Sequence, residues 1–236
     1  RRPACCVAPL SPASTTVFTT DFESGIPSQI SAPASQLFGV SGWAGLGPTG
    51  RKFGGSFLRH TAIRIPPTTL TLRNLPPHKS IDVDFLLALI DSWDGTELFQ
   101  VSVDGVQRFS RWFQLATGDG SSDVAAPDGL LSSGGELGFS AGPYHSRDRA
   151  YDMGVEPVFH AIPHTADSVV ITWRLGAISG AAANEWQGGN DESWAIDGIT
   201  VRVNEASLAV GDTPHSGLIL AAFPDPSREG LSSLRF

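Results

Sequence analysis

Short runs of alternating hydrophobic and polar residues, separated by glycine- and proline-rich turns, extend over most of this chain. Alternation with a period of two is typical of a strand with one buried face. It is clear at residues 69–73, and again at 98–103 and 106–109, which Asp104-Gly105 joins into a predicted hairpin. The same kind of pattern predicts further strands at residues 15–23, 37–43, 53–65, 81–90, 155–159, 168–175 and 191–203.

The pattern of residues 81–90 indicates the centre of a sheet. This stretch alternates at first, with Asp82 and Asp84 outward, and then becomes apolar on both faces. About ten short strands and no amphipathic helix predict an all-β fold, an antiparallel two-sheet β-sandwich of the jelly-roll kind. Two long stretches of small and polar residues, 116–150 and 176–190, are predicted loops. A loop as long as the first is usually functional, or else contains a strand that the pattern does not reveal.

The sequence divides into three parts. Residues 1–14 are rich in proline and form a predicted extended arm. Residues 15–204 form the predicted sandwich. Residues 205–236 form a tail whose one apolar segment, 217–223, we expect to dock on the domain or on a neighbouring molecule.

Charge and composition exclude some classes of function. A net charge of −8 disfavours binding to nucleic acid, whose phosphates require a basic surface. No apolar run is long enough to span a membrane. The chain begins at Arg1 without Met, so we expect a processed or trimmed N-terminus. The adjacent Cys5 and Cys6 either pair with another chain or remain unpaired thiols.

Asp197 is the most informative charged residue of the last predicted strand. Read as a regular strand, residues 191–203 place the odd positions from Ala195 to Val203 on one face, and that part of the face is apolar except for Asp197. A buried carboxylate must be hydrogen-bonded, paired with a cation or coordinated to a metal. If the sandwich places its first and last strands together, Asp21 and Glu23 can reach Asp197. These three residues are the first candidate ligand set for calcium, which prefers six to eight oxygen ligands.

Other titratable residues are weaker candidates for metal binding. Four further acidic residues form either a second calcium set or an extension of the first: Asp91, Asp94, Asp191 and Glu192. The alternative for all of these acids is that they cap turns and face water. His160 and His164 have the spacing of a zinc pair on a helix, but Pro163 between them argues against a helix.

Tryptophans in loops are candidate ligand contacts. Trp93 and Trp186 lie in predicted loops and could stack on the apolar face of a sugar, whereas Trp173 and Trp194 lie in strands and could simply be core. Catalysis is not expected. The chain has neither the Glu-x-Asp-x-x-Glu arrangement of a strand-borne glycosidase pair nor a Gly-x-Ser-x-Gly elbow.

Three motifs carry a resemblance to known domains. They are Asp21-Phe22-Glu23, the segment from Trp194 to Val201, and Asp91-Ser92-Trp93-Asp94-Gly95 after the hydrophobic central strand. Together they resemble extracellular jelly rolls of the concanavalin-A-like and galactose-binding-like kind, which include MAM domains, laminin-G-like domains and many carbohydrate-binding modules. In several such families an acidic residue near the first strand and an Asp on the last strand share a structural calcium with backbone carbonyls. The resemblance implies this role for Asp197.

Two functions follow as expectations. The first is a non-catalytic extracellular recognition or adhesion module, stabilised by calcium, that binds glycan or protein through its long loops. The second is a structural subunit of an extracellular filament or surface coat, assembled through its arm, its cysteines and its apolar tail. An isolated secreted enzyme ranks behind both.

Overall fold

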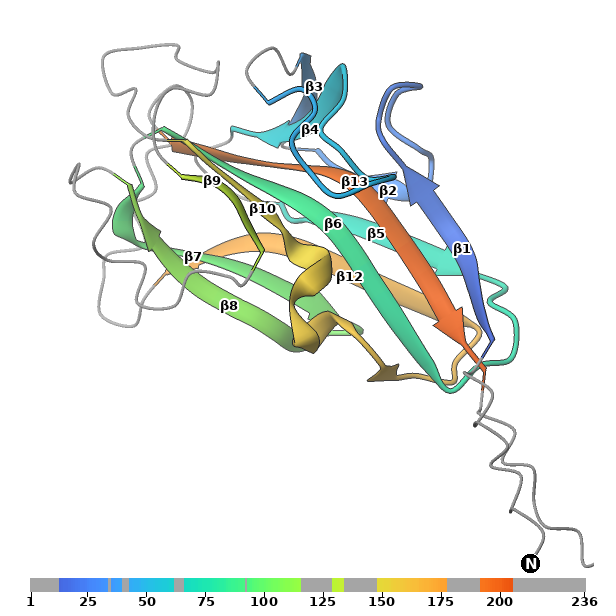
Figure 1. Ribbon diagram of the computed structural model, residues 1–236. Coiled ribbons are helices and arrows are strands. Elements are labelled where there is room, and N and C mark those ends of the chain that lie inside the picture. Colours follow the sequence, from blue (N-terminus) through green and yellow to red (C-terminus); the bar gives the residue numbers. More distant parts are fainter. Residues whose placement is uncertain are drawn as a thin grey trace, which may run out of the picture. The chain divides into compact units, whose positions relative to one another are not determined.

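The structure is a computed structural model that describes residues 13–33, 35–39, 43–61, 66–91, 93–115, 129–133, 148–177 and 192–205. These residues belong to one compact unit, Pro12–Ala206. They form two antiparallel sheets packed face to face, which confirms the predicted all-β sandwich (Figure 1). The Pro-rich arm up to residue 12, both cysteines and the tail from residue 206 lie outside the described residues.

Eight strands form the first sheet. In order across the sheet they are β3 (Ser35–Gly39), β4 (Ser56–His60), β13 (Glu192–Asn204), β6 (Ser80–Asp91), β10 (Arg149–Asp152) and β9 (Leu130–Ser133), with β1 (Ser14–Thr20) paired to β13 and β11 (Ile162–Pro163) to β6. The second sheet has five strands: β2 (Ile30–Ser31), β5 (Thr68–Arg73), β12 (Ser168–Ala177), β7 (Asp94–Val103) and β8 (Val106–Gln114).

The main hydrophobic core lies between the two sheets. The five-stranded sheet contributes residues such as Leu70 and Trp173, and the eight-stranded sheet contributes residues such as Phe85 and Trp194. Their aromatic rings meet edge to face, with the centroids of Phe85 and Trp173 5.7 Å apart and those of Phe99 and Trp194 5.3 Å apart. Edge-to-face contacts of this kind add to the free energy gained by burial.

A smaller hydrophobic core covers the outer face of the eight-stranded sheet. The loop between β3 and β4 folds back so that Trp43 and Phe53 cover Leu86, Ala88 and Ile90 of β6. The opposite face of β6 contributes to the main core. Strand β6 is therefore buried on both faces, as its apolar second half predicted.

Strand β13 lies at the centre of the eight-stranded sheet. It pairs with β6 along its whole length, while its other edge pairs first with β4 and then with β1 (Figure 1). The predicted adjacency of the first and last strands is thus confirmed. Strands β4 and β1 pair with successive parts of the same edge of β13 and leave a gap between them. The site described below lies at that gap.

The predicted side-chain alternation of β13 is wrong at one point. Its register with β6 shifts between Asp197 and Thr200, where Gly198 has a φ of 53°. This is the geometry of a β-bulge with glycine in the left-handed region. The bulge reverses the alternation, so Ile196 and Ile199 both face the main core, whereas Ala195 packs in the smaller core on the opposite face. Asp197 is therefore buried outside the space between the sheets.

Three other predictions differ from the structure. Residues 155–159 form parts of two short 3₁₀ turns, η1 (Met153–Val155) and η2 (Pro157–Phe159), rather than a strand. The stretch predicted as a long loop contains β9 and the start of β10. The short strand predicted at 37–43 begins and ends earlier, at Ser35–Gly39, with residues 40–42 outside the described part. None of the described residues forms a helix long and apolar enough to cross a membrane.

Candidate functional site

Asp197 lies where three segments of the eight-stranded sheet meet. Pairing with β1 extends only to Ile199 and pairing with β4 only to Ile196, so the bulge of β13 faces the gap between its two partners. The carboxylate of Asp197 accepts hydrogen bonds from the backbone N–H of Gly54, at 3.3 Å, and from that of Gly198, at 2.6 Å. Both groups come from backbone beside the gap, which fixes the position of the carboxylate.

Glu23 reaches the same gap from the turn that follows β1. Its Oε1 accepts a hydrogen bond from the backbone N–H of Ser56 at 2.7 Å. Its carboxylate oxygens lie 2.7 and 2.6 Å from the positions that a Cβ would occupy on Gly54 and Gly55, so only glycine allows this approach. Asp21 lies in the same turn and accepts a hydrogen bond from the N–H of Glu23 at 3.2 Å. The three acids predicted as one set therefore lie in one region.

The electrostatics of this region disfavour a negative charge on Asp197. Burial raises its pKa from the ordinary 3.8 to about 7, although the two N–H donors oppose the shift, and the charges of Glu23 and Asp21 raise the pKa further. A bound cation would reverse this balance, because it favours the ionised carboxylate.

The fit of these residues to a calcium ion is partial. All three side chains offer carboxylate oxygens, the donor type that calcium prefers. Asp197 is fully buried, whereas Asp21 and Glu23 are exposed. Among the residues that the structure describes, no three His, Cys, Asp or Glu side chains are arranged as metal ligands. Calcium binding would require the two exposed carboxylates to turn toward Asp197, and it remains a prediction.

The second predicted acidic set lies elsewhere, at the end of β6. Asp91 and Glu192 are register partners on β6 and β13, and both are fully buried. A guanidinium nitrogen of Arg59 lies 3.7 Å from Asp91, and the N–H of Asp91 donates to Asp148 at 3.0 Å. Burial lowers the pKa of Arg59, whereas the negative charges of Asp91 and Asp148 act to raise it. This ion-paired cluster is separate from the gap beside Asp197. Asp191 and the side chain of Asp94 lie outside the described residues.

Of the two tryptophans predicted to contact a ligand, Trp93 lies among the described residues. Trp93 is fully buried, its ring packs edge to face on Phe113 at 5.8 Å, and its Nε1 donates to the carbonyl of Ser193 at 3.0 Å. No face of that ring is open to a sugar, so Trp93 is a core residue and not a ligand contact. Trp186 lies outside the described residues.

His164 also has a different partner from the one its spacing to His160 suggested. Its Nδ1 lies 2.6 Å from Nε2 of His78, and its Nε2 lies 3.1 Å from a carboxylate oxygen of Asp104. This contact ties the loop before β6 to the turn between β7 and β8. His160 instead contacts the carbonyl of Gly154 at 2.6 Å.

A serine and a histidine that the sequence analysis did not identify lie in contact, an arrangement that in some enzymes activates the serine as a nucleophile. The hydroxyl of Ser35 lies 3.2 Å from Nδ1 of His60, and the His60 ring stacks on Trp194 with centroids 4.8 Å apart. Burial lowers the pKa of His60 to about 4. An effective general base needs a pKa near the working pH. His60 is therefore poorly suited to activate Ser35 near neutral pH.

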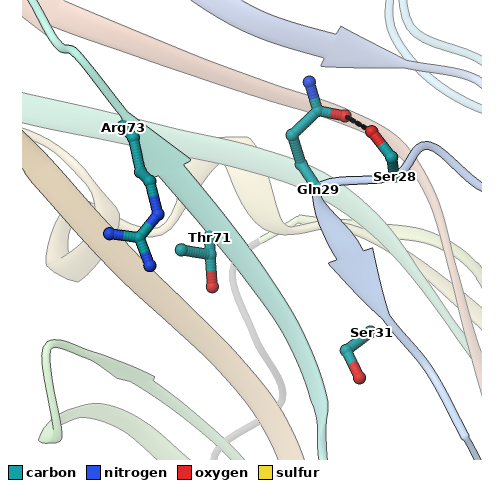
Figure 2. Close-up of a pocket in the computed structure, with 5 residues that line it drawn as sticks. All are labelled: Ser28, Gln29, Ser31, Thr71 and Arg73. Atoms are coloured by element: carbon teal, nitrogen blue, oxygen red, sulfur yellow. Dashed lines mark hydrogen bonds between the residues drawn. The ribbon is translucent and has the colours of Figure 1, made fainter.

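An open groove on the five-stranded sheet is a second candidate site. It has a volume of about 510 Å³ and is lined by Ser28, Gln29, Ser31, Thr71 and Arg73 (Figure 2). On β5, Leu70 and Leu72 point into the core, so Thr71 and Arg73 point outward, as the alternation predicted. The opposite wall comes from the segment around β2, where Ile30 points into the core and its chain neighbours Gln29 and Ser31 line the groove.

The sequence alone did not reveal this groove because its two walls come from different kinds of segment. Thr71 and Arg73 lie on a regular strand whose polar face is evident. Ser28, Gln29 and Ser31 lie in a Pro/Ser/Ala-rich stretch, where a strand of two residues leaves no periodic pattern. The pairing of Ile30 with Leu70 brings the two walls together.

Comparison with known proteins gives only distant likenesses. No family model and no curated protein matches the chain. The cleaved adhesin domain of Lys-gingipain from Porphyromonas gingivalis is similar over 80% of this chain and 99% of that domain, with 13% identity and a TM-score of 0.41. The xylan-binding CBM22-1 domain of Xyn10C from Paenibacillus barcinonensis is similar over 83% and 99%, with 11% identity and a TM-score of 0.36. Latent PorU from Porphyromonas gingivalis is similar over 86% of this chain and 14% of its own, with 10% identity and a TM-score of 0.40.

Proposed function

We propose that this chain is a non-catalytic extracellular binding module that holds a glycan in the groove between β2 and β5. The groove itself is the observation that carries the proposal. Its hydroxyl, amide and guanidinium groups are of the kind that hydrogen-bond to sugar hydroxyls. A protein partner is less well matched, because protein interfaces are usually centred on apolar or aromatic anchors, and none lines this groove.

The test of this function is a binding survey with the purified full chain. Immobilised plant, fungal and bacterial polysaccharides are incubated with the protein, and retained protein is quantified. We expect retention by a restricted class of polysaccharide, which the variant Thr71→Met should lose because a longer, uncharged side chain would fill the groove and remove a hydroxyl. Unchanged thermal unfolding of that variant would show that its fold is intact. The proposal would be contradicted if no polysaccharide retained the wild type, or if the wild type and the Thr71 variant were retained equally.

Calcium is the second part of the proposed function. We propose that the ion lies beside Asp197, with Asp21 and Glu23 as further ligands, because a cation there would compensate the buried carboxylate and its two acidic neighbours. Chelation should lower the melting temperature by several degrees, since a ligand that binds only the folded state stabilises it. Differential scanning calorimetry with and without added calcium measures this shift. Asp197→Asn should remove the response, and a wild-type melting temperature that is indifferent to calcium would exclude the site.

A further inference from the structure

Arg73 is the one charged side chain that lines the groove. Its side chain is exposed, and it forms no ion pair or hydrogen bond with any residue that the structure describes. The other lining groups are three hydroxyls and the amide of Gln29, whose Oε1 accepts a hydrogen bond from Ser28 at 3.3 Å. Figure 2 shows Thr71 and Arg73 on β5 across from Gln29 and Ser31. The groove thus presents a positive charge among neutral hydrogen-bonding groups.

Charge is distributed unevenly between the two sheets. Strands β2, β5, β8 and β12 of the five-stranded sheet contain no Asp or Glu, although they contain Arg73, Arg108, Arg111 and Arg174. The fifth strand, β7, contains Asp94 and Glu97, whose side chains lie outside the described residues. The eight-stranded sheet, in contrast, carries six acids on β6, β10 and β13, together with two arginines on these strands, Arg149 and Arg202, and one on β4, Arg59. The six acids are Asp82, Asp84, Asp91, Asp152, Glu192 and Asp197. In a protein of net charge −8, four strands that contain arginine and no acid depart from the average composition, and of these arginines Arg73 lines the groove.

We infer that the groove binds an acidic glycan, a sugar chain that carries carboxylate or sulfate groups, and that Arg73 pairs with the acidic group. This inference rests on the proposed function and adds the chemical class of its ligand. A guanidinium group binds a carboxylate or sulfate through two parallel hydrogen bonds, and these bonds are stronger than those between neutral groups. The serine and threonine hydroxyls and the Gln29 amide are then left for the hydroxyls of the sugar.

The same chemistry argues against nucleic acid as the anionic ligand. Single-stranded nucleic acids are held by stacking of bases on aromatic side chains together with a basic channel. The groove has no aromatic lining residue and a single cation. The overall net charge of −8 would also repel a long polyphosphate.

The test compares acidic glycans with neutral forms of the same chains. Oligogalacturonate with its methyl ester, and a sulfated galactan oligosaccharide with its desulfated form, are titrated into the purified full chain by isothermal titration calorimetry at constant calcium. We expect oligogalacturonate, the sulfated chain or both to bind, and the neutral form of each bound chain to bind at least about tenfold more weakly. Arg73→Gln should reduce acidic binding to the level of the neutral form, and Arg73→Lys should recover part of it, because lysine keeps the charge but not the paired hydrogen bonds.

Lys52→Gln provides the matched control, because it removes the same charge from an exposed residue of the loop between β3 and β4. Acidic binding should be unchanged in this variant. An equal loss in Lys52→Gln and Arg73→Gln would show attraction to overall charge alone and would overturn the inference. Equal affinity for a bound acidic chain and its neutral form would overturn it too, while leaving the proposed glycan-binding function in place. Failure of every polysaccharide in the broader survey would instead remove the proposed function itself.

Discussion

Replacing Gly198 by alanine should lower the free energy of unfolding by about 3–5 kcal/mol. Two costs combine. The φ of 53° places an alanine in the left-handed region, which costs roughly 1–2 kcal/mol. The new Cβ would also lie 2.5 Å from Cγ of Arg51, so the arginine must move.

The position of Arg51 explains why that second cost is large. Its side chain is mostly buried across the bulge, with one guanidinium nitrogen 3.0 Å from Asp84 and the other bonded to Asp152. If Arg51 were displaced, both acids would lose its guanidinium group. Asp152 would keep only the hydrogen bond from the N–H of Gly154, and Asp84 would keep its ion pair with Arg202 at 2.6 Å. Breaking one side of a buried ion pair typically costs about 3–5 kcal/mol. Because both acids keep a partner, we expect about 2–3 kcal/mol here, which with the left-handed backbone gives the total of about 3–5 kcal/mol.

Gly50→Ala is the matched control for Gly198→Ala. Gly50 also has a positive φ, 80°, but a Cβ there would meet open space. Urea unfolding should therefore show a loss of only about 1–2 kcal/mol for this variant. In a double-mutant cycle, Gly198→Ala should cost far less in an Arg51→Ala background, because alanine has no Cγ to meet the new methyl group. Similar losses for the two glycine variants, or full additivity in the cycle, would show that the Arg51 contact contributes nothing.

The bulge also marks where prediction from sequence fails. Three features could be predicted because they depend on strand order and hydrophobic alternation: the pairing of the first and last strands, the two-sheet architecture, and the location of Asp21 and Glu23 in the region of Asp197. The reversal at Gly198 could not be read from a strictly regular strand. One signal was present: the apolar positions change parity from Trp194 and Ile196 to Ile199 and Val201. Asp-Gly lies at the change, and glycine inside a strand often marks a bulge.

The other failures have similarly local causes. Val155 and Phe159 have the hydrophobicity of a strand, but Pro157 between them starts a 3₁₀ turn, and Gly154 precedes it. Trp93 follows β6 in a stretch with loop-like composition, yet its ring enters the main core because tertiary packing overrides local polarity. The groove depends on an edge strand of two residues, which a periodicity argument cannot detect.

Asp197 should make the calcium-free protein less stable as the pH rises from about 4 to 7. Its pKa in the folded protein is about 7, whereas an unfolded chain has the ordinary value of 3.8, so the folded state binds the proton more tightly. The stabilisation is therefore complete below pH 4 and is lost as the pH approaches 7. One pKa unit corresponds to about 1.4 kcal/mol, so the loss across this range should be roughly 3–5 kcal/mol.

Comparison with Asp197→Asn isolates this effect from every other titrating group. Asparagine keeps the size of the side chain and an oxygen that can accept from Gly54 and Gly198, but it does not ionise in this range. With calcium removed by a chelator, the difference in free energy of unfolding between the wild type and the variant should therefore change by a few kcal/mol between pH 4 and pH 7. Urea unfolding at four or five pH values measures it, and parallel profiles would show that Asp197 ionises normally. Added calcium should restore the wild type chiefly at the upper end of the range, because the cation binds the ionised carboxylate and has to displace the proton at lower pH.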